Sequence, residues 1–297
     1  MLDGEALHQK SGKASFDLIY DLADPRGYFK TLGNLDYQIP HHGQRFFSAL
    51  IEARRNGNSN GAEEAPLKVV DICCSYGVNA ALLKYETTLA DLYTRYSSEE
   101  LTELTSEQLA EADAMFYGAR RRGTPLRVIG VDVARNAVSY ALRSRLLDAG
   151  FVENLEEAEP TEEFRRAVAG ADLLTVTGGV GYISELTFER LLDCVMERPE
   201  CRVPWVAAFA LRWVSYERIS EILSRYGLLT EKLAGHTFLQ RRFVDAAERE
   251  YVLKELAKIG VDPTGKEDKG WYHADFYLSR PAEETKIPLE RLLASEL

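Results

Sequence analysis

The sequence has few cysteines and a deficit of positive charge. It holds 4 cysteines in 297 residues, and 36 lysines and arginines stand against 47 aspartates and glutamates, giving a net charge of −11. Four cysteines do not form a disulfide scaffold at this length. The adjacent pair Cys73 and Cys74 suits neither a zinc site nor a disulfide bond. We therefore expect reduced thiols and no bound metal.

Other absences exclude whole classes of function. A nucleic-acid binder needs clustered Lys and Arg, but the densest basic run, Arg120–Arg122, is short and is better explained as a helix end. No apolar run approaches the roughly 18 residues of a membrane span, and the N-terminal stretch lacks the pattern of a secretion signal. The sequence thus predicts a cytoplasmic protein with no nucleic-acid partner and no membrane contact.

The chain is instead organised around one stretch, Leu67–Leu83, with the sequence LKVVDICCSYGVNAALL. A short apolar run ends at Asp71 and Ile72, a turn of small residues follows, and a helical pattern begins after Gly77. A buried strand, a tight turn and a helix N-terminus together form a place for a ligand, because free backbone N–H groups point out of the turn. The acid at the strand end favours a ligand with an amine or with hydroxyls.

Strand and helix patterns alternate from this stretch to Tyr226, which predicts a doubly wound α/β sheet. Leu126–Val133 is a second buried strand that ends at Asp132. Ala171–Gly179 and Pro204–Trp213 are further buried strands. An acid in the position of Asp132 can accept hydrogen bonds from ribose hydroxyls, which is why nucleotide-type sites carry one.

Two common nucleotide cofactors are disfavoured by the turn itself. A dinucleotide site needs Gly-x-Gly-x-x-Gly, since the backbone must approach a bulky pyrophosphate, and the run Cys73–Gly77 contains one glycine. The Gly-x-x-x-x-Gly-Lys-Ser/Thr pattern of a P-loop is also missing. A nucleoside ligand without phosphate would tolerate side chains in this turn better than NAD or ATP would.

The same residues resemble motif I of the class I S-adenosylmethionine (SAM)-dependent methyltransferases, roughly Asp-x-Gly-Cys-Gly-x-Gly after a hydrophobic strand. Asp71, Cys74 and Gly77 match it, whereas Cys73 and Ser75 stand where the family usually has glycine. Asp132 matches motif II. The resemblance implies a Rossmann-like seven-stranded sheet with an antiparallel last strand, for which Tyr272–Leu278 is the candidate.

The resemblance also implies SAM as the cofactor, held by the turn, the strand ends and aromatic residues of the N-terminal arm. The candidate binding residues are Asp71, Cys73, Ser75, Gly77, Asn79, Asp132, Val133, Asn154, Thr177, Gly178, Tyr20, Tyr28 and Tyr37. Candidates for catalysis are Tyr182, in the TGGVGYI segment that follows a strand, and His41. That segment lacks the Asn/Asp-Pro-Pro-Tyr/Phe signature of amino-methyltransferases, which disfavours nucleobase amines as acceptors.

We expect three divisions of the chain: an N-terminal lid or arm over 1–55, a SAM-binding domain over 56–280 that opens with a surface loop at Asn56–Pro66, and a C-terminal tail over 281–297. The first is dense in Tyr and Asp and reads either as a lid or as an inert arm. A helical insertion at about 86–124 separates the first two strands, where it would cover the active site or form a homodimer contact.

Three functions remain open from the sequence. The first is a methyltransferase acting on a small molecule by in-line transfer, with the acceptor enclosed by the arm and the insertion. The second is an enzyme of the same fold that breaks another C–S bond of SAM, for example by cyclisation with release of methylthioadenosine. The third is a non-catalytic partner protein with this fold, which the retained Asp71 and Asp132 disfavour.

Overall fold

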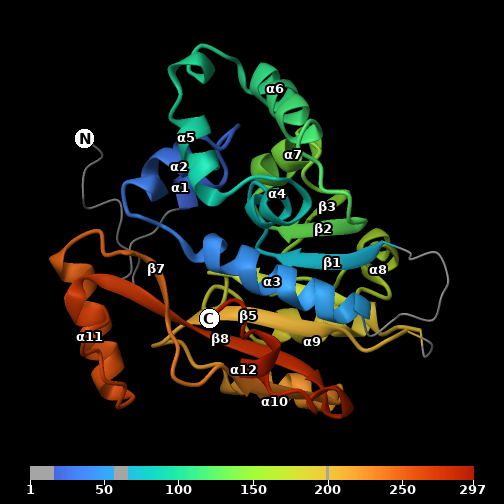
Figure 1. The fold of residues 1–297 in the computed structure, drawn as a ribbon, viewed down its shortest axis with the longest axis vertical. Coiled ribbons are helices and arrows are strands. Elements are labelled where there is room, and N and C mark those ends of the chain that lie inside the picture. Colours follow the sequence, from blue (N-terminus) through green and yellow to red (C-terminus); the bar gives the residue numbers. More distant parts are fainter. Residues whose placement is uncertain (1–16, 57–65, 199–200) are drawn as a thin grey trace.

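One mixed sheet organises the molecule. The structure is a computed structural model that describes residues 17–56, 66–198 and 201–297. Within them the sheet has eight strands in the order β3-β2-β1-β4-β5-β8-β6, with β7 also paired to β8 (Figure 1). The strands are β1 Leu67–Ile72, β2 Leu126–Asp132, β3 Ala149–Val152, β4 Leu173–Thr177, β5 Trp205–Leu211, β6 Leu228–Lys232, β7 Phe238–Arg242 and β8 Trp271–Pro281.

Strands β1 to β5 are parallel, and β8 runs antiparallel to β5, β6 and β7. The predicted doubly wound sheet and its antiparallel final strand are therefore confirmed. There is one strand more than the expected seven, because the segment after β6 supplies β7 as well. β6 pairs with the second half of β8, and β7 pairs with the start of β8. The long strand β8 therefore forms hydrogen bonds with two shorter strands.

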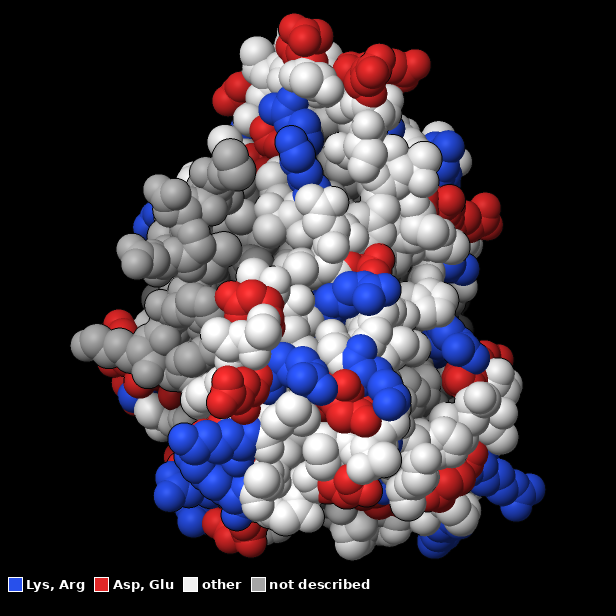
Figure 2. All heavy atoms as spheres, turned by 90° about the vertical axis from the view of Figure 1, so that its left-hand side faces the viewer, with Lys and Arg blue, Asp and Glu red and all other residues white. Residues whose placement is uncertain are grey.

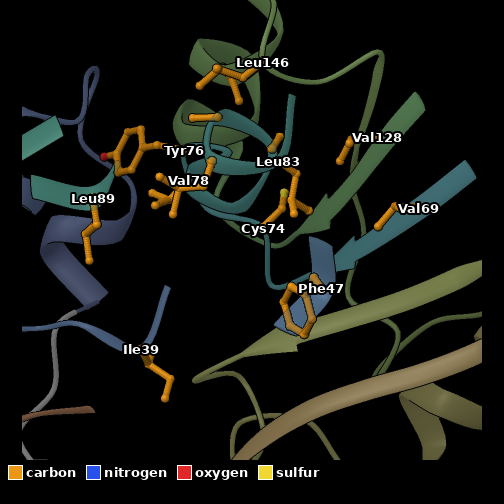
Figure 3. Close-up of a cluster of buried hydrophobic side chains, with 14 of the residues drawn as sticks. Ile39, Phe47, Val69, Cys74, Tyr76, Val78, Leu83, Leu89, Val128 and Leu146 are labelled. Carbon is orange, nitrogen blue, oxygen red and sulfur yellow. The ribbon is translucent and has the colours of Figure 1, made fainter. Parts of the chain in front are cut away.

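Helices cover both faces of the sheet, because the side chains of its parallel strands alternate between two buried layers. Val69 and Val128 point to the layer made by α3, α4 and α7, where Figure 3 shows them near Phe47 and Leu83. The opposite layer is made by α8, α9 and α10. The helices are α1 Asp17–Tyr20, α2 Arg26–Gly33, α3 Ile39–Asn56, α4 Val78–Lys84, α5 Leu89–Tyr96, α6 Ser106–Gly118, α7 Arg135–Arg143, α8 Glu162–Val168, α9 Glu185–Val195, α10 Glu217–Arg225, α11 Ala246–Lys258 and α12 Leu289–Leu292.

The described part of the N-terminal segment 1–55 is helical. It holds α1, α2 and all of α3 except its last residue, and the arm that lies over the site is the part before α3. Pro25 precedes α2 and Pro40 lies in the first turn of α3, positions that proline tolerates because the early N–H groups of a helix have no partner. Residues 1–16 of the expected lid and most of the Asn56–Pro66 loop lie outside the described residues.

The insertion between α4 and β2 is helical as predicted, with α5, a 3₁₀ turn at Glu99–Leu101 and α6. Its centre is Asp113, fully buried, which accepts hydrogen bonds from Arg95 at 2.8 and 2.6 Å, from Tyr140 at 2.6 Å and from Tyr96. Since Tyr140 belongs to α7, this carboxylate joins both insertion helices to the main domain. A buried carboxylate is tolerated only when it is satisfied in this way.

The C-terminal part completes the fold around β8. Helix α11 and a 3₁₀ turn at Glu267–Lys269 connect β7 to β8, and after β8 come a 3₁₀ turn at Ala282–Glu284 and α12. Leu289 and Leu293 are buried in the same cluster as α3, so the expected polar tail packs onto the domain. Among the described residues, no helix combines the length and the apolar composition that a membrane crossing requires.

Candidate functional site

A cavity of about 380 Å³ lies at the carboxyl ends of β2, β1 and β4, beneath the N-terminal arm. Between β1 and β4 the strand order reverses direction along the chain, and ligands of open α/β sheets bind at such a switch point. The lining residues are Tyr20, Asp21, Tyr28, Leu32, Tyr37, Pro40, Cys73, Cys74, Ser75, Val78, Asn79, Asp132, Val133, Ala134, Thr177, Gly178, Gly179, Tyr182, Gln240 and Arg241.

The floor of the cavity is the turn after β1. Two of the three positions in this turn that have the left-handed backbone typical of glycine carry a side chain instead. Cys73, Ser75 and Gly77 all have positive φ, at 57°, 48° and 76°, in the left-handed region that costs a side chain about 1 kcal/mol. The Cys73 side chain fits because Gly179, which faces it, has no side chain. A Cβ on Gly179 would lie 2.8 Å from Cys73 Sγ. The departure from the family pattern is therefore accommodated by a glycine on the next loop.

Two buried oxygens at the base of the cavity have no hydrogen-bond partner among the described residues. Asp71 Oδ1 accepts from Asn79 Nδ2 and Thr175 Oγ1, both at 2.9 Å, but Asp71 Oδ2 and Asn79 Oδ1 accept from nothing. Burial raises the pKa of Asp71 to about 7, outweighing those two hydrogen bonds. Unsatisfied buried acceptors cost about 1–3 kcal/mol each, so the site suits a ligand that donates.

The acid at the end of β2 faces the cavity while fixing the turn. Asp132 Oδ2 accepts from the Ser75 N–H at 2.8 Å and Oδ1 from the Ala134 N–H at 2.9 Å. Burial raises the pKa of Asp132, although these backbone bonds oppose the shift. Each oxygen has a second lone pair, so the carboxylate can still accept hydrogen bonds from a ligand in the cavity.

The N-terminal arm is tied down over the cavity by two groups of contacts. The Tyr76 hydroxyl, on the turn after β1, donates to the carbonyls of Ile19 at 3.1 Å and Leu22 at 2.9 Å, and Figure 3 shows its ring directed away from the sheet toward the arm. On the other side, Asp21 Oδ1 accepts from the Asn136 N–H in the first turn of α7 at 2.6 Å. The arm is thus closed onto the residues that form the site.

The structure brings most of the predicted site residues together. Those that line the cavity are Tyr20, Tyr28, Tyr37, Cys73, Ser75, Asn79, Asp132, Val133, Thr177, Gly178 and Tyr182. Asp71 lies just beneath, bonded to Asn79. Gly77 is not part of the lining: a Cβ there would lie 3.2 Å from Ala141 and Leu146, so it serves helix packing.

Two predicted residues lie elsewhere. Asn154 follows β3 and is not in the cavity wall; its Oδ1 accepts from the Glu156 N–H at 3.1 Å in a local turn. His41 is exposed in the first turn of α3 and is also outside the lining. Its neighbour His42 packs on Phe238, and burial lowers the pKa of His42 to about 4. The described cavity wall therefore contains no histidine.

The sequence interpretation missed the contribution of β7. Gln240 and Arg241 line the cavity, and both side chains are less than one-tenth exposed. The segment TFLQRRF shows no clear alternation, so the only signal was the run Gln240–Arg242 of three polar residues between apolar ones. Which of them faces a cavity depends on pairing with the start of β8, a contact that the sequence does not reveal.

The insertion does not enclose the cavity, contrary to the expectation that it helps to surround an acceptor. None of the described residues 86–124 is in the lining. Helix α5 instead packs behind the arm, with the Phe29 ring stacked on Tyr96 at 4.4 Å and edge-on to Tyr93 at 5.6 Å. Arg26 also donates to the carbonyls of Leu101 and Leu104. The insertion is therefore a support for the arm.

Figure 2 views the molecule from the side where the arm lies in Figure 1. Over the described part of that face, lysines and arginines are interspersed with aspartates and glutamates. Phosphate backbones are bound by basic groups gathered into a stripe or patch. Within the same described residues, no group of three His, Cys, Asp or Glu side chains could hold a metal ion.

Comparison with known proteins gives structural likenesses only. No protein-family model and no curated protein matches the sequence. Among solved structures, the plantazolicin methyltransferase BpumL in complex with SAH is 9% identical, with 89% of this chain and 95% of that chain covered and a TM-score of 0.41. The magnesium protoporphyrin IX methyltransferase of Synechocystis with bound SAM is 11% identical, at 80% of each chain and a TM-score of 0.37.

A TehB-like SAM-dependent methyltransferase from Corynebacterium glutamicum is 14% identical, with 77% of this chain and 85% of that chain covered and a TM-score of 0.36. The [4+2]-cyclase SpnF is 13% identical, at 79% and 80% coverage and a TM-score of 0.34. The fold assignment rests on the strand order and register of the sheet itself.

Proposed function

We propose that the protein is a SAM-dependent methyltransferase that acts on a small molecule in the cavity under the N-terminal arm. The observation that carries this proposal is the base of the cavity, where Asp71 Oδ2 and Asn79 Oδ1 are buried acceptors without a donor. An ammonium group supplies up to three donors and a positive charge to such a place. The methionine end of SAM has an ammonium group, and NAD and ATP do not.

Other residues of the cavity fit the rest of the cofactor. Asp132 would accept hydrogen bonds from the ribose hydroxyls, and Val133, 63% exposed at the cavity wall, offers apolar contact. Tyr20, Tyr28 and Tyr37 surround the opposite side, with the Tyr20–Tyr28 ring centroids 5.7 Å apart and the Tyr28–Tyr37 centroids 6.5 Å apart. Aromatic faces stabilise a cation such as a sulfonium.

When bound, SAM supplies an electrophilic methyl carbon: the acceptor's lone pair forms the new bond, and the electrons of the broken C–S bond stay on sulfur. The chain's part is to align the acceptor and to exclude water. Burial raises the pKa of Tyr20 and Tyr28, so these phenols stay protonated and donate at neutral pH. With no histidine in the described wall, we expect an acceptor that needs no strong base.

The size of the cavity bears on how large the acceptor can be. A volume of about 380 Å³ lies near the lower end of the range for a single drug-sized ligand, which is about 300–1,000 Å³. With the arm closed, a large acceptor does not fit beside a cofactor. This volume supports a small acceptor, or an alternative in which SAM itself is cleaved or cyclised there with release of methylthioadenosine.

Product analysis tests the proposal. The purified protein is incubated with SAM alone and with pools of small nucleophiles, and products are identified by mass spectrometry. We expect S-adenosylhomocysteine (SAH) only when an acceptor is present, together with an acceptor that is heavier by one methylene unit. Methylthioadenosine formed from SAM alone would instead establish the alternative. Asp132→Ala serves as the inactive control, because it removes the ribose acceptor and the bond that fixes Ser75.

A further inference from the structure

The arm side of the cavity holds four hydrogen-bonding groups with no partner among the described residues. They are the hydroxyls of Tyr20, Tyr28 and Tyr37 and the amide of Gln240, all in the cavity wall. Tyr28, Tyr37 and Gln240 are 4%, 7% and 6% exposed, so water reaches them only through the cavity. Because these polar groups line the cavity and pair with no described side chain, they are available to hydrogen-bond a polar part of a ligand.

A fixed positive charge lies in the same wall. Arg241 is 4% exposed and is held by Glu248 of α11, which is fully buried, through two parallel hydrogen bonds of 2.9 and 2.8 Å. Its guanidinium also lies over the Tyr272 ring at 4.6 Å. Burial lowers the pKa of Arg241, but the Glu248 bonds and charge outweigh it and raise the pKa overall. A bidentate pair fixes the plane of the guanidinium, so little order is lost when it binds a ligand.

The donors converge at the end of β4. A Cβ on Gly178 would lie 3.1 Å from Gln240 Nε2 and 3.1 Å from the Tyr37 hydroxyl, so both atoms approach the backbone that follows Thr177. Tyr20, Tyr182 and Arg241 all line the same cavity. The acids that line the cavity, Asp21 and Asp132, are bonded to backbone N–H groups on the α7 side.

Apart from Asp21 of the arm, the polar groups of the cavity are thus divided, with carboxylate acceptors toward β2 and donors toward β7 and the arm tyrosines. We propose that the methyl acceptor carries a carboxylate, or an equally planar oxyanion, and that Arg241, Gln240 and Tyr37 bind it. This inference rests on the proposed function and names the substrate class for it. Glu248 is a positioning residue in this account, because it holds the guanidinium and does not reach the ligand.

A carboxylate could come from two sources, since the methionine end of SAM has one as well. That carboxylate is attached to the carbon that carries the ammonium group, whose buried acceptors are Asp71 and Asn79 at the base of the cavity. Arg241 enters from β7 on the arm side. We therefore assign the oxyanion site to the acceptor. The experiment includes titrations that separate the acceptor's carboxylate from that of SAM.

The test uses the full chain, both ligand-free and saturated with SAH, and four probes: benzoate and phenylacetate with their carboxamides. Binding is measured by calorimetry and by saturation-transfer NMR. We expect the carboxylates to bind at least tenfold more tightly than the matched amides. Equal binding of acids and amides, or no binding of either acid, would overturn the proposal, while SAH binding in the same samples would leave the proposed function standing. Absence of SAH binding would overturn both.

Variants assign the preference to residues. Arg241→Met alone would leave the buried Glu248 carboxylate without its charge partner, so it is combined with Glu248→Gln. Gln240→Met is the milder second variant. The matched control is Arg280→Met with Glu231→Gln, because Arg280 is equally buried and bonded to Glu231 at 2.8 Å, away from the cavity wall. We expect the acid preference to vanish in the Arg241 double variant, to fall about threefold in Gln240→Met and to persist in the control.

A second set of titrations tests the cofactor. It compares SAH with methylthioadenosine, which lacks the carboxylate and the ammonium group. We expect the affinities of both to change less than twofold in the Arg241 double variant. If SAH binding weakens tenfold while methylthioadenosine binding does not, Arg241 holds the cofactor's own carboxylate and the assignment to the acceptor is wrong. The Glu248→Gln single variant should raise the dissociation constant of benzoate without affecting SAH, as expected for a residue that only orients Arg241.

Discussion

At the scale of single residues, the cavity depends on groups that the fold leaves unsatisfied. Asp71 shares its Oδ1 between Asn79 and Thr175 and has a second oxygen with no donor among the described residues. Natural proteins tolerate such atoms where a ligand completes them, because each one lowers the stability of the ligand-free state. The same feature that weakens the fold therefore gives the binding site its selectivity.

The raised pKa of Asp71 predicts that the free energy of unfolding decreases as the pH rises. Its pKa in the folded protein is about 7, against 3.8 in a model peptide. Between these values the folded state binds the extra proton, so the free energy of unfolding falls as the pH rises from about 4 to about 7. The difference of about 3 units, at roughly 1.4 kcal/mol per pKa unit, gives an expected contribution of about 4 kcal/mol.

Asp71→Asn should remove that contribution. Urea unfolding at pH 5 and pH 8, compared between wild type and Asp71→Asn, isolates the effect because the other titrating groups cancel. We expect the variant to lose less stability than wild type over this interval, and to bind SAH at least tenfold more weakly at pH 8. An identical pH 5-to-8 difference in both proteins would show that Asp71 is already ionised at pH 5.

Sequence reasoning located residues near the cavity where a motif fixes their position in the chain. The acids at the ends of β1 and β2 lie at the cavity because the carboxyl ends of adjacent parallel strands meet at one edge. Arg241 and Gln240 were missed because their role comes from the pairing of β7 with β8 and from Glu248 on a different element. His41 is exposed in the first turn of α3, outside the described cavity lining, and its catalytic role stays a prediction.

At the scale of elements, the arm and the insertion form one unit over the site. Asp24 accepts from Arg26 at 2.7 Å and from Ser106 of the insertion at 2.7 Å, and Tyr93 of α5 donates to the Tyr37 carbonyl at 2.6 Å. The sequence predicted that both segments exist. It did not predict that one supports the other, because the contacts of Ser106 with Asp24 and of Tyr93 with Tyr37 join residues more than 50 positions apart.

The Tyr76 hydroxyl should control the release of the ligand. Tyr76→Phe removes the one hydroxyl proton that the Ile19 and Leu22 carbonyls share, while keeping the ring contacts with Tyr28 and Tyr140. The loss of one shared hydrogen bond of about 1 kcal/mol predicts SAH dissociation about fivefold faster, measured by stopped-flow displacement.

Tyr85→Phe is the matched control for that change. Tyr85 is equally buried and its hydroxyl donates to the Arg145 carbonyl at 2.7 Å, but it does not touch the cavity wall or the arm. The account expects its SAH dissociation rate to stay within twofold of wild type. Equal acceleration in both variants would mean that lost stability, and not an opened arm, causes the effect.

At the scale of the whole molecule, the sheet order was predictable and the closure of the site was not. Alternating buried strands and helices specify a doubly wound sheet, since right-handed crossovers leave few other arrangements. The single cavity wall built from the arm, three strand ends and β7 depends on tertiary contacts across the entire chain. A largely apolar cavity of about 380 Å³ with Asp132 at one wall and Arg241 at another is the molecular feature that the proposed function uses.

The most direct test of the central claim is a calorimetric titration of SAH into the ligand-free protein, with ATP as the comparison ligand and Asp132→Ala as the comparison variant. The account predicts one SAH bound per chain, no detectable ATP binding, and a dissociation constant about 10- to 100-fold larger for Asp132→Ala. No heat of binding with SAH, or ATP binding as tight as SAH, would contradict the assignment of this cavity to SAM.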